Sequence, residues 1–282
     1  MANFKDLKDP VKREKRSEQQ LEMLRQMRLF DDTFFTAVFK SNNKCVQLML
    51  RVILGRNDII VDRVTTQESM ANLHGRFVRL DVFAHDKAGR LYDIEIQRSN
   101  DGASVKRARY NRAMMDANVS YPGEKFENLP ETYVIFITEN DYMKRGKPMY
   151  EVVSYIKETG EVFDDGTHII YVNGKYKGND PIGFLINDLW CVDPANMHNT
   201  ILAEAVRYFK YTEEGIEKVC DVMDEYQARI HAEERMEAVM VFANQVKNLI
   251  AKSHVTEKDA FKILCIPDKY HEDILNVLDK AK

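Results

Sequence analysis

The strongest constraint on the fold is a stretch in which polar and apolar side chains alternate. It covers residues 76–99, RFVRLDVFAHDKAGRLYDIEIQRS. A period of two predicts half-buried strands, here over residues 76–85 and 90–98. Gly89 is well placed as the left-handed residue of a three-residue loop, Lys87-Ala88-Gly89, between them. The stretch therefore predicts an antiparallel β-hairpin.

The loop length also predicts the register of this hairpin. Asp86 falls opposite Arg90, so Asp81 falls opposite Glu95. Opposed side chains have Cβ atoms about 5 Å apart, and two like charges that close destabilise each other unless a cation or a shared proton lies between them. Two carboxylates with this spacing, together with a backbone carbonyl, suit Mg²⁺ or another hard divalent cation. The alternative is a solvated acidic patch whose charge is offset by nearby arginines, Arg76, Arg79 and Arg98.

Strands and helices on either side of the hairpin predict a mixed α/β domain. A first strand is expected within residues 59–68, a helix over 103–119, and a buried strand over 133–138, YVIFIT. This order of elements indicates a mixed sheet. An extra hairpin is expected from residues 162–163 and 168–172, around an Asp-Asp-Gly turn.

Capping residues predict helices ahead of the sheet. Asp32 or Thr33 can cap one helix, and Asn42 or Asn43 opens another that Gly55 ends. A further helical region follows the sheet.

That C-terminal region is helical from Asn196 onward, with a long helix from Glu213 to about Lys252. Its apolar residues follow heptad-like spacing over only part of its length. Because this helix is rich in acidic residues, we expect it to pack on the domain or to form a homodimer with another copy.

Composition excludes several classes of protein. The net charge is −4, and the four cysteines are scattered without a CxxC pair, which argues against a disulfide framework or a zinc site. The N-terminus is charged and the apolar runs are short, so neither a secretory signal nor a membrane span is expected. We therefore expect a cytoplasmic protein with no membrane partner.

Several segments in order resemble one known family. They are 32–39 (DTFFTAVF), 79–82 (RLDV), 92–97 (YDIEIQ), 107–110 (RARY) and 123–126 (GEKF). Together they resemble the PD-(D/E)xK nuclease superfamily, and more narrowly the PD-(D/E)xK nuclease family transposases, which are related to the recombination-promoting nucleases. The resemblance extends over roughly residues 30–280. It implies a restriction-endonuclease-like mixed sheet flanked by helices over residues 30–190, after a leader and helix over 1–29 and before a helical region over 191–282.

The resemblance also implies roles for individual carboxylates. Asp81 and Glu95 are expected to bind the divalent metal, which is Mg²⁺ or else Mn²⁺ or Ca²⁺. Glu68, on the preceding strand, and Asp32, at the start of the first family helix, are further candidate ligands. The alternatives are a surface position for Glu68 and a plain N-cap for Asp32.

Gln97 completes the expected catalytic set, but it stands where many members of the superfamily have a lysine. That lysine helps to activate the attacking water and to stabilise the developing charge, which a neutral amide does less well. Arg79, Arg98 or Lys106 is expected to supply the missing charge.

The implied function is that of a metal-dependent DNA endonuclease associated with mobile elements and recombination. The alternatives are a degenerate relative that binds DNA or a protein without cleaving, and a structural or regulatory α/β protein.

The expected DNA contact lies on the helix over 103–119. Four basic side chains there suit phosphates, with only Asp116 opposing them: Lys106, Arg107, Arg109 and Arg112. Tyr110 is expected to pack against a sugar or base. The alternative is an ordinary exposed helix face.

Overall fold

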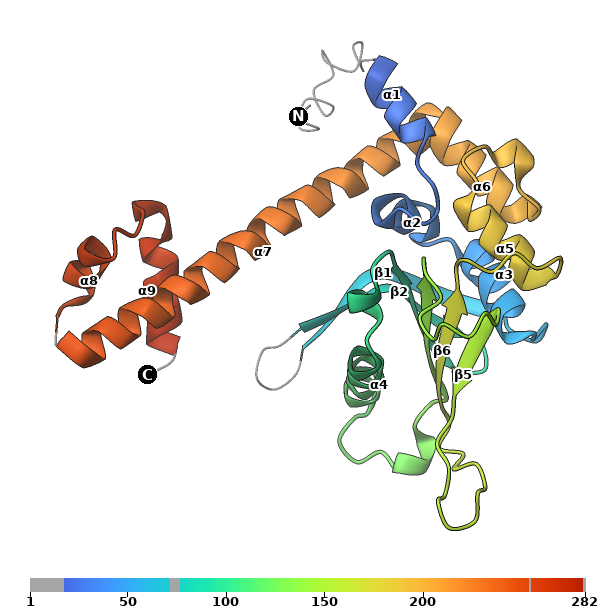
Figure 1. The fold of residues 1–282 in the computed structure, drawn as a ribbon, viewed down its shortest axis with the longest axis horizontal. Helices are drawn as coiled ribbons and strands as arrows, with labels where there is room; N and C mark the ends of the chain where they lie inside the picture. The colour runs from blue at the N-terminus through green and yellow to red at the C-terminus, as the bar shows by residue number, and fades with distance from the viewer. Residues whose placement is uncertain (1–17, 72–76, 254, 281–282) are drawn as a thin grey trace. The chain divides into compact units, whose positions relative to one another are not determined.

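The computed structural model describes residues 18–71, 77–253 and 255–280, and its strands form one six-stranded sheet (Figure 1). The strand order is β1-β2-β3-β4-β6-β5. The strands are β1 (Val61–Ala71), β2 (Phe77–Asp86), β3 (Leu91–Gln97), β4 (Thr132–Thr138), β5 (Met149–Val152) and β6 (Thr167–Asn173). The β1–β2–β3 pairs and the β5–β6 pair are antiparallel, whereas β3, β4 and β6 run parallel.

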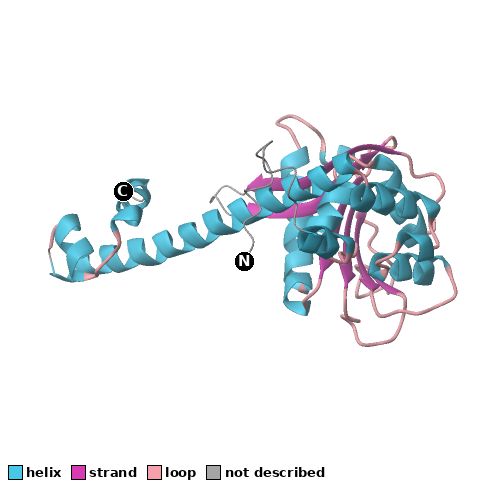
Figure 2. Ribbon diagram, turned by 90° about the horizontal axis from the view of Figure 1, so that it is seen from above, coloured by secondary structure: helices cyan, strands magenta, loops and turns pink. Residues whose placement is uncertain are grey.

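Helices lie on both sides of this mixed sheet (Figure 2). They are α1 (Glu18–Arg25), α2 (Asp32–Phe39), α3 (Asn43–Leu54), α4 (Val105–Val119), α5 (Pro181–Trp190), α6 (Thr200–Tyr211), α7 (Glu213–Ser253), α8 (Glu257–Ile263) and α9 (His271–Lys280). Helix α4 packs against β1, β2 and β4, while α2 and α3 contact β1 and also pack with α6. The mixed sheet, the flanking helices and the helical C-terminal region confirm the predicted fold class.

The chain divides into two compact units, residues 1–222 and 223–282, and the division falls within α7. The second unit has its own small core, to which Val239, Phe261 and Ile274 belong. Helix α6 and the start of α7 therefore belong with the sheet. The predicted limits of 1–29, 30–190 and 191–282 stay a prediction. The charged leader, residues 1–17, and Arg76 lie outside the described residues.

The β2–β3 hairpin has the predicted loop and register. Gly89 has a positive φ of 85°. The ladder pairs Val82 with Ile94 and His85 with Leu91, as the three-residue loop predicts. The hairpin carries Asp81 and Glu95 into the sheet with this register.

The buried carboxylate of Asp86 organises the turn of this hairpin. It accepts hydrogen bonds from the backbone N–H groups of Ala88 and Arg90, both at 2.9 Å. The Arg90 guanidinium (2.6 Å) and the Tyr92 hydroxyl (2.9 Å) donate to its other oxygen. These contacts satisfy a carboxylate that is otherwise costly to bury.

Both faces of the central strands are covered, so the polar face of the hairpin is not solvated. The face under α4 packs together with apolar residues of that helix, and its buried members include Phe83, Leu91, Val134, Phe136 and Tyr171. The opposite face is also buried and includes Ile94, Ile96, Ile135, Ile137, Ile170 and Val172. Parallel strands covered on both faces read as continuous apolar runs, and β4 is buried along its whole length. The solvated acidic patch is therefore wrong, because α4 covers the side chains of β3 on that face.

Three further expectations need correction. The hairpin from residues 162–163 and 168–172 is wrong, because β6 pairs with β5 and β4, and Val162 forms only a single bridge with Tyr155. Residues 181–190 form a helix, α5, that was not predicted, although Asp180 caps it and Pro181 begins it. The N-cap of α2 is Asp31 rather than Asp32 or Thr33.

No helix in the described part of the chain is long and apolar enough to span a bilayer.

Candidate active site

The site forms where β2 and β3 separate. The ladder ends at Val82 and Ile94, and the next hydrogen-bonded pair would join Leu80 to Ile96. Instead, the Ile96 N–H donates to Asp81 Oδ2 at 3.1 Å, and the Asp81 N–H donates to Glu95 Oε1 at 3.3 Å. Each carboxylate thus takes a backbone N–H of the facing strand, which holds both between the strands.

Burial and mutual repulsion set the electrostatics of these acids. Glu95 is fully buried and Asp81 is half-buried. Burial raises the pKa of the Asp81 carboxyl well above its ordinary value, and the charge of Glu95 raises it further. Burial likewise raises the pKa of Glu95 well above its ordinary value, with the charge of Asp93 as the next cause. The two acids therefore repel each other, as the hairpin register predicts.

A third carboxylate, Asp93, belongs to the same group and was not predicted as a site residue. It is fully buried and accepts a hydrogen bond from Asn111 Nδ2 of α4 at 3.0 Å. Burial raises its pKa to about 7, and the charge of Asp81 also acts in that direction. The alternating pattern of the hairpin could have identified Asp93, because it places this residue on the same polar face as Glu95.

Arg107 of α4 supplies the positive charge at this site. Its Nη2 donates to Glu95 Oε2 at 2.6 Å, and its Nη1 donates to the Gly102 carbonyl at 3.0 Å. Ser104 caps the helix and accepts from the Arg107 N–H. Arg107 was expected on DNA phosphates, but the structure pairs it with Glu95 instead.

Of the three cations expected to replace the missing lysine, Arg98 forms ion pairs with other acids: its guanidinium lies 3.3 Å from Asp31 and 3.4 Å from Glu139. Lys106 is exposed on α4. Arg79 is half-buried and lies opposite Ser69 in the β1–β2 ladder, and its expected role stays a prediction. Lys106 and Arg107 are neighbours on α4 and so point in different directions. Which of the two faces the sheet depends on how α4 packs.

Gln97 lies beside the carboxylates, as expected from the motif. Its Nε2 donates to Glu95 Oε2 at 3.2 Å, the same oxygen that Arg107 contacts. Gly102 leaves room for this amide, since a Cβ on Gly102 would lie 1.8 Å from Gln97 Oε1. The two donors together hold the Glu95 side chain in one orientation.

The two further candidate ligands differ in placement. Asp32 is exposed at the start of α2, and its charge is one cause of the raised pKa of Asp81, so α2 begins near the site. Glu68 pairs with Leu80 in the β1–β2 ladder. Its neighbour Gln67 contacts the site, with Nε2 at 3.4 Å from Asp81 Oδ1. A metal-binding role for Glu68 stays a prediction.

The basic helix does not present a single exposed face of four cations. Lys106 and Arg109 are exposed, whereas Arg107 binds Glu95. Arg112 donates from Nη1 to Thr167 Oγ1 at 3.0 Å, and Tyr110 packs against the core under α4. The exposed part of the predicted DNA contact is therefore the pair Lys106 and Arg109.

The carboxylates of Asp81 and Glu95 suit a hard cation that binds few protein ligands. In the described residues, no group of three or more His, Cys, Asp or Glu side chains is arranged to hold a metal ion. Mg²⁺ is usually bound through one or two carboxylates and keeps several waters. The Asp81 and Glu95 pair fits that requirement, because a cation between them would offset their repulsion.

Buried carboxylates between separating strands of a mixed sheet define a class of α/β proteins with a candidate metal site. Residues 29–177, more than half of the 282-residue chain, match the family model of the PD-(D/E)XK nuclease family transposases. The chain therefore belongs to the PD-(D/E)XK nuclease family transposases. No curated protein matches the chain, and no solved structure does.

Proposed function

We propose that this protein hydrolyses phosphodiester bonds in DNA with the help of a divalent cation. The observation that carries the proposal is the repulsion between the half-buried Asp81 and the buried Glu95 at the point where β2 and β3 separate. Membership of a nuclease family supports the reaction class. In this proposal the protein acts in recombination associated with mobile elements, in the cytoplasm.

Each residue of the site has a distinct part in the proposal. Asp81 and Glu95 would hold Mg²⁺, or else Mn²⁺ or Ca²⁺, which lowers the pKa of a bound water and offsets charge on the phosphate. Gln97 and Arg107 orient the Glu95 carboxylate, and the guanidinium supplies a positive charge that Gln97 does not. Lys106 and Arg109 are the exposed cations on α4 that contact DNA phosphates.

A second candidate function is binding of DNA without cleavage. The salt bridge between Arg107 and Glu95 favours it, since the guanidinium already neutralises one of the two carboxylates. Gln97 cannot replace the charge of a lysine. Homodimer formation through the C-terminal helices and binding of a protein partner stay predictions.

A plasmid-nicking assay separates the two candidates. Wild-type protein is compared with the near-isosteric variants Asp81→Asn and Glu95→Gln, and with Asp164→Asn at an exposed loop position as the control. Each is tested with Mg²⁺, Mn²⁺, Ca²⁺ or EDTA. We expect scission by the wild type and the control, none in EDTA, and a loss of at least about 100-fold in the two site variants, as for removal of a catalytic charge-stabilising group. Scission that survives both site substitutions would contradict the proposal, whereas DNA binding without scission by any protein would support the second candidate.

A further inference from the structure

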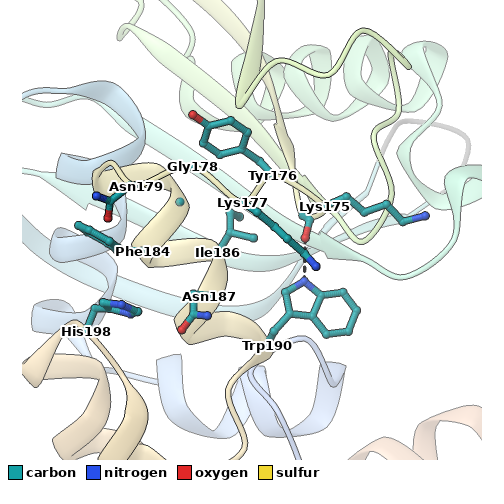
Figure 3. Close-up of a pocket in the computed structure, with 12 residues that line it drawn as sticks. Lys175, Tyr176, Lys177, Gly178, Asn179, Phe184, Ile186, Asn187, Trp190 and His198 are labelled. Atoms are coloured by element: carbon teal, nitrogen blue, oxygen red, sulfur yellow. Dashed lines mark hydrogen bonds between the residues drawn. The ribbon is translucent and has the colours of Figure 1, made fainter.

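A cavity of about 690 Å³ lies beside the C-terminal end of β6 (Figure 3). It is formed by the loop 174–179 and by α5, with His198 at one side. Its volume is within the range of small-molecule sites. None of the residues assigned to the candidate active site lines it, so it is a separate site.

Close packing of the loop builds one wall of this cavity. The Gly174 N–H donates to the Thr138 carbonyl at 2.7 Å, and a Cβ on Gly174 would lie 2.4 Å from that oxygen and 2.8 Å from the Phe30 ring. A Cβ on Gly183 would lie 1.9 Å from the Gly178 carbonyl oxygen. The two glycines therefore let the loop lie directly against β4 and α5.

The cavity carries positive charge in a protein whose net charge is −4. Lys175 and Lys177 line it, and none of its described lining residues is acidic. Two acids lie beside it. Asp180, the N-cap of α5, accepts from the Tyr176 hydroxyl and the Gly183 N–H, and the fully buried Asp188 accepts from His198 and Asn199. The charged side chains of the lining itself are the two lysines, and these suit an anionic group of a ligand.

The indole ring of Trp190 lines the same cavity and is fixed in orientation by its contacts. Trp190 donates from Nε1 to the Gly174 carbonyl at 2.7 Å, and it packs against Phe30 with ring centroids 4.6 Å apart. The guanidinium of Arg28 lies 4.9 Å from the indole ring. In Figure 3, the Lys177 side chain extends in the direction of Trp190, whereas Lys175 points away from it. These contacts fix the orientation of Trp190, which is half-buried and leaves part of its ring to the cavity.

Exposed amides complete the set of binding groups. Asn179 and Asn187 line the cavity and are exposed, and each carries both donors and an acceptor for the edge of a base. An aromatic ring, nearby lysines and amides together form the chemistry that binds a nucleotide, through stacking and phosphate contacts.

The position of the cavity relates it to the candidate active site. Gln97, Thr138 and Asn173 are in register on the adjacent parallel strands β3, β4 and β6. Adjacent strands are about 4.8 Å apart, so Asn173 lies roughly 10 Å from Gln97 across the sheet. The cavity begins at the next residue, Gly174, so the cavity and Gln97 lie at the same end of these parallel strands.

We propose that this cavity binds one nucleotide, with its base against Trp190 and its phosphate at Lys177. The nucleotide comes from the DNA strand that is cleaved at Asp81 and Glu95, and in this respect the inference rests on the proposed function. A free mononucleotide has the same chemistry and is distinguished by experiment.

Trp190 is the single tryptophan of the chain, so its fluorescence reports on this cavity. The full-length protein is titrated in EDTA with a short single-stranded oligonucleotide, with dAMP and with inorganic phosphate. Lys177→Gln is the test variant, and Lys157→Gln, at an exposed loop position, is the matched control. Circular dichroism establishes that both variants are folded.

We expect saturable quenching by the oligonucleotide, with a Kd that Lys177→Gln raises several-fold and Lys157→Gln leaves unchanged. The salt dependence of log Kd should fall by about one unit of slope in Lys177→Gln, as for loss of one phosphate contact. An oligonucleotide that binds at least ten-fold more tightly than dAMP supports the substrate strand as the source. Equal affinities support a free nucleotide in the same cavity.

Three outcomes would overturn the inference: no quenching by either nucleotide probe, the same Kd for Lys177→Gln and Lys157→Gln, or phosphate alone binding as tightly as dAMP. The measurement is made without a metal, so it does not depend on cleavage. Quenching without plasmid nicking would defeat the proposed function alone, and nicking without quenching would defeat the nucleotide cavity alone.

Discussion

Arg107 shows how one residue takes its role from packing rather than from its place in a motif. In the sequence it belongs to a row of basic residues that suits DNA phosphates, together with Lys106 and Arg109. In the structure its guanidinium lies 2.6 Å from the buried carboxylate of Glu95. A buried carboxylate that lacks a partner is strongly destabilising. Which member of the row turns inward depends on the rotation of α4 over the sheet, and this rotation is not encoded in local spacing.

The pairing of carboxylates was predictable, because it follows from loop length alone. Gly89 and the three-residue loop set a register in which Asp81 lies opposite Glu95, and this register requires no tertiary contact. Their burial was not predictable from the same alternation, which fits a solvated face equally well. The distinction comes from α4, whose Asn111 contacts Asp93 from a distant part of the sequence.

Asp93 predicts an unusual dependence of stability on pH. Burial raises its pKa from 3.8 to about 7 in the folded protein. The folded state then binds more protons than the unfolded state between about pH 4 and pH 7, so stability falls as the pH rises through this range. We expect Asp93→Asn to remove this loss. The free energy of unfolding of the variant, measured relative to the wild type, should therefore be higher at pH 8 than at pH 4 by up to about 4 kcal/mol.

Urea denaturation at the two pH values measures this difference. Asp164→Asn, at an exposed position, is the control. Its free energy of unfolding relative to the wild type should be nearly the same at pH 4 and pH 8. A difference between Asp93→Asn and the wild type that is the same at pH 4 and pH 8 would show that Asp93 has no raised pKa in the folded protein.

At the scale of elements, the parallel part of the sheet depends on close approach of the loop after β6 to β4. Gly174 is buried there, and a Cβ would meet the Thr138 backbone oxygen at 2.4 Å. The pairing of β6 with β4 and β5 was missed, because a short apolar strand has several possible partners and local turn residues favoured residues 162–163. Gly174 allows the chain after β6 to pack against β4, the strand with which β6 pairs.

Substitution of Gly174 tests this close approach. We expect Gly174→Ala to cost about 3 kcal/mol of stability through steric overlap with backbone. Gly89→Ala is the comparison, because a Cβ there meets open space and only the positive φ is strained, which costs about 1 kcal/mol. The denaturation midpoints of Gly174→Ala and Gly89→Ala, each compared with the wild type, measure the two losses of stability. Equal losses would mean that the loop after β6 can move away from β4 without cost.

At the scale of the first compact unit, helices far apart in the sequence are joined by one buried lysine. Lys210 of α6 donates to the carbonyls of Arg25 (2.8 Å) and Val192 (2.6 Å), and its ammonium lies 5.4 Å from the Phe34 ring. Burial lowers its pKa to about 8. The lysine ties α1, α6 and the segment after α5 together beside α2, and the charge of Asp32 at the start of α2 acts on Asp81. Support for the site therefore extends beyond the hairpin that carries its carboxylates.

The proposed function requires that Asp81 and Glu95 form a divalent-cation site in the folded molecule. Calorimetric titration of the full chain with Mg²⁺ and Mn²⁺ measures binding at this site, with Glu95→Gln as the variant. We predict that the wild type binds one ion, with an affinity that rises with pH because both carboxyls have raised pKa values and must lose protons to bind. Glu95→Gln should bind none at this site. Equal binding of the ion by the wild type and Glu95→Gln, or no binding by either, would contradict the account.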